Sequence, residues 1–109
     1  MQWRYQEAVE LTVGRFVERA VPDVGGLERA VFDAVPVTAS DAPEAWHISA
    51  FIPTSAQECW LEFDLLAHDA AADSWEARDL QALRGSRNPD DPTTYRWNDV
   101  DGVWEVARA

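Results

Sequence analysis

The amino-acid sequence predicts an α+β fold, with two N-terminal helices packed on a small antiparallel sheet that includes a C-terminal β-hairpin. Two patterns indicate this architecture. Apolar residues recur at helical spacing before residue 36, and they alternate with polar residues between residues 46 and 67. We expect residues 1–109 to form a single domain, because a chain of this length with six tryptophans can bury a core without a disulfide.

The first predicted helix covers residues 5–21. As a strand, this segment would place Arg15 and Arg19 on the same face as apolar residues, so the helix is favoured over the strand. One face of the helix carries the apolar residues Tyr5, Val9, Val13, Phe16, Val17 and Ala20.

The second predicted helix covers residues 27–35 and follows a break at residues 22–26, which contain a proline and two glycines. Its apolar residues have the i, i+3, i+4, i+7 spacing of a short amphipathic helix, and Pro36 ends the run. These apolar residues are Leu27, Ala30, Val31, Ala34 and Val35. Residues 36–45 are predicted to form a loop.

The clearest strand pattern lies in residues 46–52 and 58–67, which a five-residue connection joins as a hairpin. One face of the second strand is continuously apolar and is predicted to face the core, with Cys59, Leu61, Phe63 and Leu65. The opposite face of that strand carries Glu58, Trp60, Glu62 and Asp64. The alternation therefore predicts an outward tryptophan among carboxylates.

Residues 69–84 are predicted to form a third helix. Several alanines and leucines favour it, Asp69 or Asp73 can cap its start, and Gly85 lies just past its end. A strand around Trp75, Ala77 and Asp79 is the alternative.

The C-terminal segment predicts a β-hairpin with Asp101-Gly102 as a two-residue turn, so that Trp97 faces Val106. Residues 95–106, which end in Asp-Gly-Val-Trp-Glu-Val, resemble the last hairpin of nuclear-transport-factor-2-like (cystatin-like) domains. The resemblance implies an alternative fold with a curved sheet, a pocket and a strand over residues 74–83. It implies no site residues, because the catalytic His–Asp pairs of that family have no counterpart at positions of this sequence.

Acidic residues gather in the middle of the chain. Between Arg29 and Arg78 there are nine acidic residues and no basic one, within a total formal charge of -11. Direct binding to nucleic acid or to anionic membranes is disfavoured, because both rely on Lys and Arg. No apolar run has the length of a signal peptide or a membrane span, so we expect a cytoplasmic protein. The absence of lysine, with abundant alanine, favours a bacterial or phage origin.

No catalytic motif accompanies this charge. His47 and His68 lack the spacings of metal-ligand motifs. Cys59 lies between Glu58 and Glu62, not among the cations that activate a thiol. We therefore expect no catalytic residue, no metal and no cofactor, and a role other than catalysis is favoured.

The sequence predicts a small acidic module that occupies a basic surface of a partner protein. Immunity proteins, antitoxins and phage-type inhibitors, including those that mimic nucleic acid, are such modules, and their partners are toxins or nucleic-acid-processing enzymes. The predicted partner-binding residues are Glu58, Trp60, Glu62, Asp64, Asp69 and Asp73. Two alternatives stay open: a cystatin-like domain that binds or converts a small molecule, and an assembly or secretion-chaperone protein.

Overall fold

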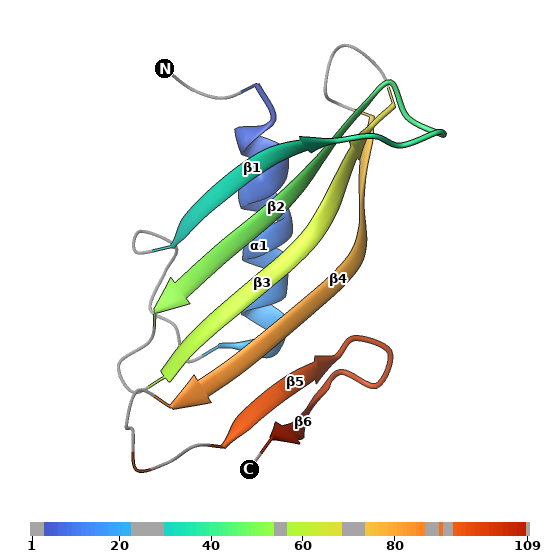
Figure 1. The fold of residues 1–109 in the computed structure, drawn as a ribbon. Helices are drawn as coiled ribbons and strands as arrows, with labels where there is room; N and C mark the ends of the chain where they lie inside the picture. The colour runs from blue at the N-terminus through green and yellow to red at the C-terminus, as the bar shows by residue number, and fades with distance from the viewer. Residues whose placement is uncertain are drawn as a thin grey trace.

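The computed structural model describes residues 4–22, 30–53, 57–68, 74–86, 90 and 93–108. In these ranges a single helix, α1 (Gln6–Ala20), lies across one face of a six-stranded antiparallel sheet whose strands follow one another in chain order (Figure 1). The strands are β1 (Val31–Val37), β2 (Glu44–Pro53), β3 (Gln57–Ala67), β4 (Trp75–Ser86), β5 (Thr94–Asn98) and β6 (Val103–Arg108). The predicted fold of two N-terminal helices on a small sheet is therefore wrong.

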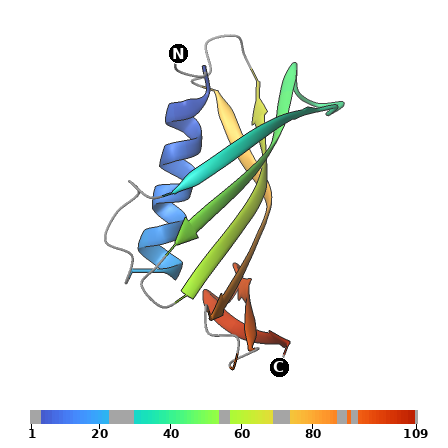
Figure 2. The same cartoon turned by 60° about the vertical axis from the view of Figure 1, so that its left-hand side comes forward.

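The core lies between α1 and the inner face of the sheet, which we define as the face that α1 covers (Figure 2). Val9 and Phe16 of α1 and Ile48 and Leu61 of the sheet are at most 5% exposed. Each fully buried side chain of this kind contributes roughly 1.5–3 kcal/mol to stability. The predicted helix over residues 5–21 and the predicted hairpin, now β2 and β3, are confirmed. No helix in the described ranges is long and apolar enough to cross a membrane.

The second predicted helix is wrong, because residues 31–37 form the edge strand β1, which pairs with β2. Residues 27–29 lie outside the described residues. Val31 and Val35 face away from α1, and Phe32 packs against the core. The apolar residues of this short segment fit the period of a helix and also that of a strand. Its β-branched residues favour a strand, and an edge strand tolerates Pro36.

The predicted helix over residues 69–84 is also wrong, because residues 75–86 form β4. Residues 69–73 lie outside the described residues. A β-bulge interrupts this strand, where Asp79 and Leu80 together lie opposite one residue of β3. Asp79 has a φ of 56°, a left-handed conformation that aspartate tolerates better than most side chains.

The bulge explains why the sequence of β4 resembles a helix. Trp75 and Ala77 lie on the inner face before the bulge, and Leu80 and Ala82 lie on it after the bulge. The spacing of these apolar residues is therefore two, then three, then two. A strict strand period is broken at the bulge, and the mixed spacing is close to that of a helix.

The C-terminal hairpin has a four-residue loop and not the predicted two-residue turn. Residues 99–102 form this loop between Asn98 and β6. The side-chain oxygen of Asn98 accepts hydrogen bonds from the backbone N–H groups of Val100 and Asp101, at 3.1 and 3.0 Å. Gly102 closes the loop with a φ of 68°, which costs glycine little. The asparagine side chain thus stabilises a loop that turn propensity alone does not predict.

The longer loop shifts the register, so that Trp97 pairs with Trp104 and not with Val106. The two indole rings lie 5.2 Å apart, and each meets the ring of Phe16 edge-on. The Trp104 indole N–H also donates a hydrogen bond of 2.8 Å to the carbonyl of Ala20. These contacts anchor the hairpin to the C-terminal end of α1.

Candidate functional site

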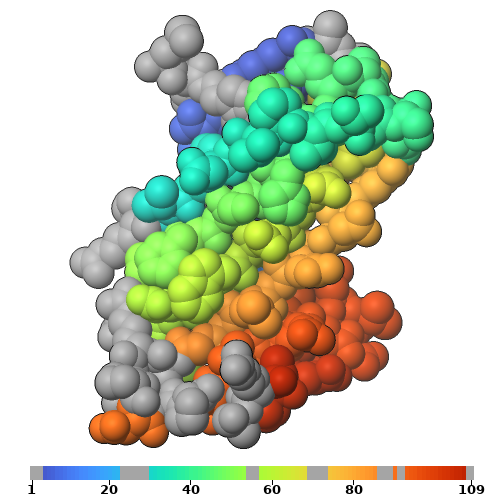
Figure 3. Space-filling model, viewed as in Figure 1, coloured from blue at the N-terminus to red at the C-terminus, as the bar shows by residue number. Residues whose placement is uncertain are grey.

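The outer face of the sheet is the face opposite α1, and no helix of the described residues covers it (Figure 3). The strand register brings together four large apolar side chains, which we call the apolar row: Val31, Phe51, Trp60 and Leu83. Trp60 is 43% exposed, and its ring lies 5.7 Å from that of Phe51. The outer face therefore presents a continuous apolar stripe across four strands.

Carboxylates flank the apolar row on both sides. The next row of paired residues on the outer face is Asp33, Ser49, Glu62 and Gln81. Glu58 lies on the other side of the apolar row, one outward position earlier in β3. The Glu62 side chain is 56% exposed, and Asp33 has no ion-pair partner among the described residues. An interacting molecule can therefore meet apolar and acidic groups at once.

His47 of β2 lies between two carboxylates of β3. Its Nδ1 is 2.9 Å from Oδ1 of Asp64, and its Nε2 is 3.7 Å from Oε1 of Glu62. The hydrogen bond with Asp64 raises the pKa of His47 above its ordinary value, the charges of both carboxylates add to this, and partial burial opposes it. A protonated His47 offsets part of the negative charge, so the outer face becomes more acidic as the pH rises through that pKa.

A second cluster of charges lies farther along the outer face. Arg78 of β4 contacts Glu76 at 2.7 Å and Asp41, from the connection between β1 and β2, at 2.5 Å. His68 contacts the same carboxylate of Glu76 at 2.8 Å. The hydrogen bonds from Arg78 lower the pKa of both carboxyl groups. Asp41 and Glu76 are therefore engaged within the protein and attract a partner less than the carboxylates beside the apolar row.

Four of the six predicted partner-binding residues lie together on the outer face of β3, namely Glu58, Trp60, Glu62 and Asp64. Asp69 and Asp73 lie outside the described residues. The partner-binding role of all six stays a prediction. Sequence reasoning missed Val31 and Asp33, because it assigned them to a helix. The β-branched residues Val31, Val35 and Val37 were the signal that could have placed this segment in a strand.

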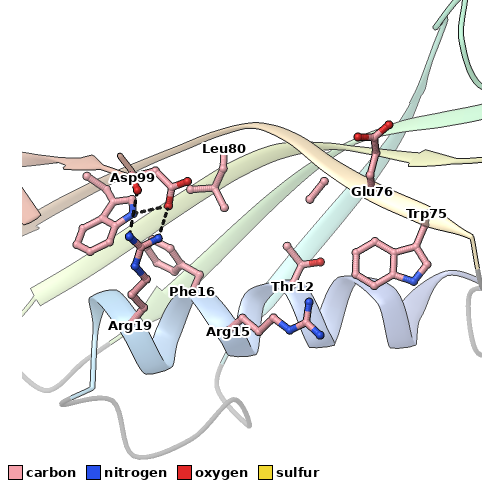
Figure 4. Close-up of a pocket in the computed structure, with 10 residues that line it drawn as sticks. Thr12, Arg15, Phe16, Arg19, Trp75, Glu76, Leu80 and Asp99 are labelled. Carbon is pink, nitrogen blue, oxygen red and sulfur yellow. Dashed lines mark hydrogen bonds and ion pairs between the residues drawn. The ribbon is translucent and has the colours of Figure 1, made fainter. Parts of the chain in front are cut away.

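A groove of about 560 Å³ separates α1 from the N-terminal half of β4 (Figure 4). The groove is open because β5 pairs with β4 only at Leu83, Arg84 and Gly85. No described strand therefore continues the sheet beside Ala77 and Leu80. The groove is lined mainly by Arg15, Phe16 and Arg19 of α1, Trp75 and Leu80 of β4, and Trp97 of β5.

Two arginines of α1 line the groove, and they differ in their contacts. The Arg19 guanidinium donates hydrogen bonds to the side chain and the carbonyl of Asp99, at 3.0 and 3.1 Å, and lies over the ring of Trp97. Arg15 has no ion-pair partner in the described part of the chain. The groove therefore holds one cation that is already paired and one that is not.

Within the described ranges, no three His, Cys, Asp or Glu side chains are grouped so that they could hold a metal ion. Cys59 is completely buried on the inner face, where a thiol packs as a small apolar side chain. Neither site thus offers metal ligands or an accessible thiol.

The chain matches no protein-family model, no curated protein and no solved structure. The resemblance of the C-terminal hairpin to nuclear-transport-factor-2-like domains gains no support from these comparisons.

Proposed function

We propose that this protein binds a partner protein through the outer face of its sheet, in the manner of an immunity protein, an antitoxin or a phage-type inhibitor. The partner presents a basic surface with an apolar centre and is a toxin or a nucleic-acid-processing enzyme. The observation that carries this proposal is the exposed apolar row beside the carboxylates of Asp33 and Glu62.

The exposure of the apolar row supports a role as an interface, because exposed apolar side chains add little to the stability of the fold. Val31, Trp60 and Leu83 are between 41% and 65% exposed. A partner that covers them would gain roughly 25 cal/mol for each Å² of apolar surface removed from water. Trp60 is the best anchor, since it lies within the row, contacts Phe51 and has a polar rim, as the dominant residues of many interfaces do.

The charge of the outer face favours a basic partner. The chain has a formal charge of -11, and Asp33 and Glu62 place part of it next to the apolar row. Clustered carboxylates accelerate association with a basic surface and make the rate sensitive to salt. A high net charge also serves solubility. Solubility, however, gives no reason for an exposed tryptophan among the acids.

Self-assembly through the same face is the alternative that an assembly or chaperone protein would use. Two copies that each carry a charge of -11 repel each other, and this repulsion weakens as salt is added. Self-association should therefore strengthen with salt, whereas a complex with a basic partner should weaken. Size-exclusion chromatography with light scattering at low and high salt distinguishes the two, and a dimer that forms at high salt would favour self-assembly.

The test of the proposed role uses the double variant Asp33→Asn/Glu62→Gln and the partner recovered by co-purification from the native host at low salt. We expect the association rate, measured by stopped-flow fluorescence, to fall about tenfold and to depend less on salt. The control, Glu10→Gln/Glu18→Gln, removes the same charge from the exposed side of α1. Equal losses in the two variants would mean that only net charge matters, which contradicts the outer-face assignment.

A further inference from the structure

We infer that the groove between α1 and β4 binds a small organic anion that has a flat aromatic body. Three properties of the groove support this: an apolar floor, aromatic end walls and one cation without an internal partner (Figure 4). The inference is independent of the proposed partner-binding role, because the groove lies on the α1 side of β4 and the apolar row lies on the opposite face.

The floor and the end walls select a flat apolar body. Ala77 and Leu80 of β4 and Phe16 of α1 line the floor. Trp75 stands at one end of the groove (Figure 4), and Trp97 lines the other, where its indole N–H donates a hydrogen bond to Asp99. Indole rings interact most favourably with flat aromatic partners, which they can stack against or meet edge-on.

The unpaired cation selects a negative charge on that body. Arg19 is held by Asp99, and the Glu76 carboxylate is held by Arg78 and points away from α1 in Figure 4. Arg15 extends along the groove between Thr12 and Trp75 (Figure 4). A guanidinium binds a carboxylate, sulfonate or phosphate through paired hydrogen bonds. Since the chain has a formal charge of -11, which disfavours anions overall, binding of one in the groove depends on Arg15.

The size of the groove fits one small molecule. Its volume of about 560 Å³ lies within the roughly 300–1,000 Å³ that small-molecule sites usually have. One side of the groove is open to solvent, because β5 turns away from β4 beyond Leu83. A ligand can therefore place its rings on the floor, its anionic group at Arg15 and any further substituent in water.

The test compares two fluorescent probes that share an aromatic body and differ in charge: anilinonaphthalene sulfonate and its uncharged analogue N-phenylnaphthylamine. We expect the protein to bind the sulfonate about tenfold more tightly than the uncharged probe, as one charged hydrogen-bond partner allows. Arg15→Gln should abolish this preference and leave the affinity for the uncharged probe unchanged. Trp75→Ala should weaken the binding of both probes, and thermal unfolding checks that both variants fold.

Two control variants test whether the probes bind in the groove and nowhere else on the protein. Arg4→Gln removes the same charge from the start of α1, where Arg4 lies 3.5 Å from Glu44, and should keep the preference for the sulfonate. Trp60→Ala alters the apolar row and should leave both affinities unchanged. Equal affinity of the folded protein for the two probes would overturn the inference. So would a loss of sulfonate binding in Arg4→Gln or Trp60→Ala as large as in Arg15→Gln.

Discussion

Large apolar side chains lie on both faces of the sheet, but α1 covers only those of the inner face. Leu61 on the inner face is fully buried under α1, whereas Leu83 on the outer face is 41% exposed. The same residue type thus has two roles on adjacent strands. The buried side chains of the inner face account for the stability of the fold, and the apolar row of the outer face contributes little to it. The exposure of the apolar row is better explained by a function that requires it than by the stability of the fold.

The largest expected effect is a difference in stability between substitutions of these two leucines. Leu61→Ala should lower the free energy of unfolding by about 2–5 kcal/mol, because it leaves a cavity in the core. Leu83→Ala should lower it by less than about 1 kcal/mol, because its side chain already meets water. Urea unfolding followed by tryptophan fluorescence measures both. Similar losses would mean that the outer face is covered in solution, and the contrast between the faces would then be wrong.

A smaller effect is expected on binding, from the tryptophan of the apolar row. Trp60→Ala should weaken the complex with the partner by about 2 kcal/mol, mainly through faster dissociation, if the outer face is the interface. The stability of the protein alone should change by less than about 1 kcal/mol. Surface plasmon resonance measures the dissociation rate. The control is Val106→Ala, which shortens an exposed apolar side chain on β6, and an equal effect there would argue against the apolar row.

The smallest effect concerns the charges of the outer face. Because the pKa of His47 is raised in the folded state, its contribution to stability is fully present below the unfolded pKa of about 6.5 and is lost as the pH rises through the folded pKa. His47→Gln should therefore destabilise the protein more at about pH 5.5 than at about pH 8.5. The difference should stay below about 1 kcal/mol, because the side chain is 40% exposed and solvent screens the pair.

Urea unfolding of the native protein and of His47→Gln across this pH range measures that contribution. His68→Gln serves as a comparison, because His68 contacts the carboxylate of Glu76 and not that of Asp64. A destabilisation by His47→Gln that grows toward high pH would contradict the contact between His47 and the two carboxylates.

Helix α1 and the β2–β3 hairpin were predictable because each has one clear period in its apolar residues. Residues 31–37 satisfy two periods, and their pairing with β2 selects the strand. In β4, the bulge at Asp79 hides the strand period. The register of the C-terminal hairpin depends on hydrogen bonds to the Asn98 side chain, which the turn residues alone do not reveal.

The candidate surfaces were predictable only in part, because they depend on pairing between strands as well as on the pattern within each strand. The alternation within β3 places Glu58, Trp60, Glu62 and Asp64 on one face, and this follows from the strand geometry of that segment alone. The neighbours of Trp60 come from β2 and β4, so they depend on the register between strands. The groove depends on where β5 leaves β4, which no local pattern reports.

Local periodicity in this chain thus specifies which side chains of one element point the same way, because side chains alternate along a strand and repeat along a helix. It does not specify which strands are neighbours or in which register they pair, because backbone hydrogen bonds can form in several registers. Burial under α1 selects one of these arrangements. That selection places Asp33 and Glu62 on either side of Ser49 and leaves Arg15 without an ion-pair partner among the described residues.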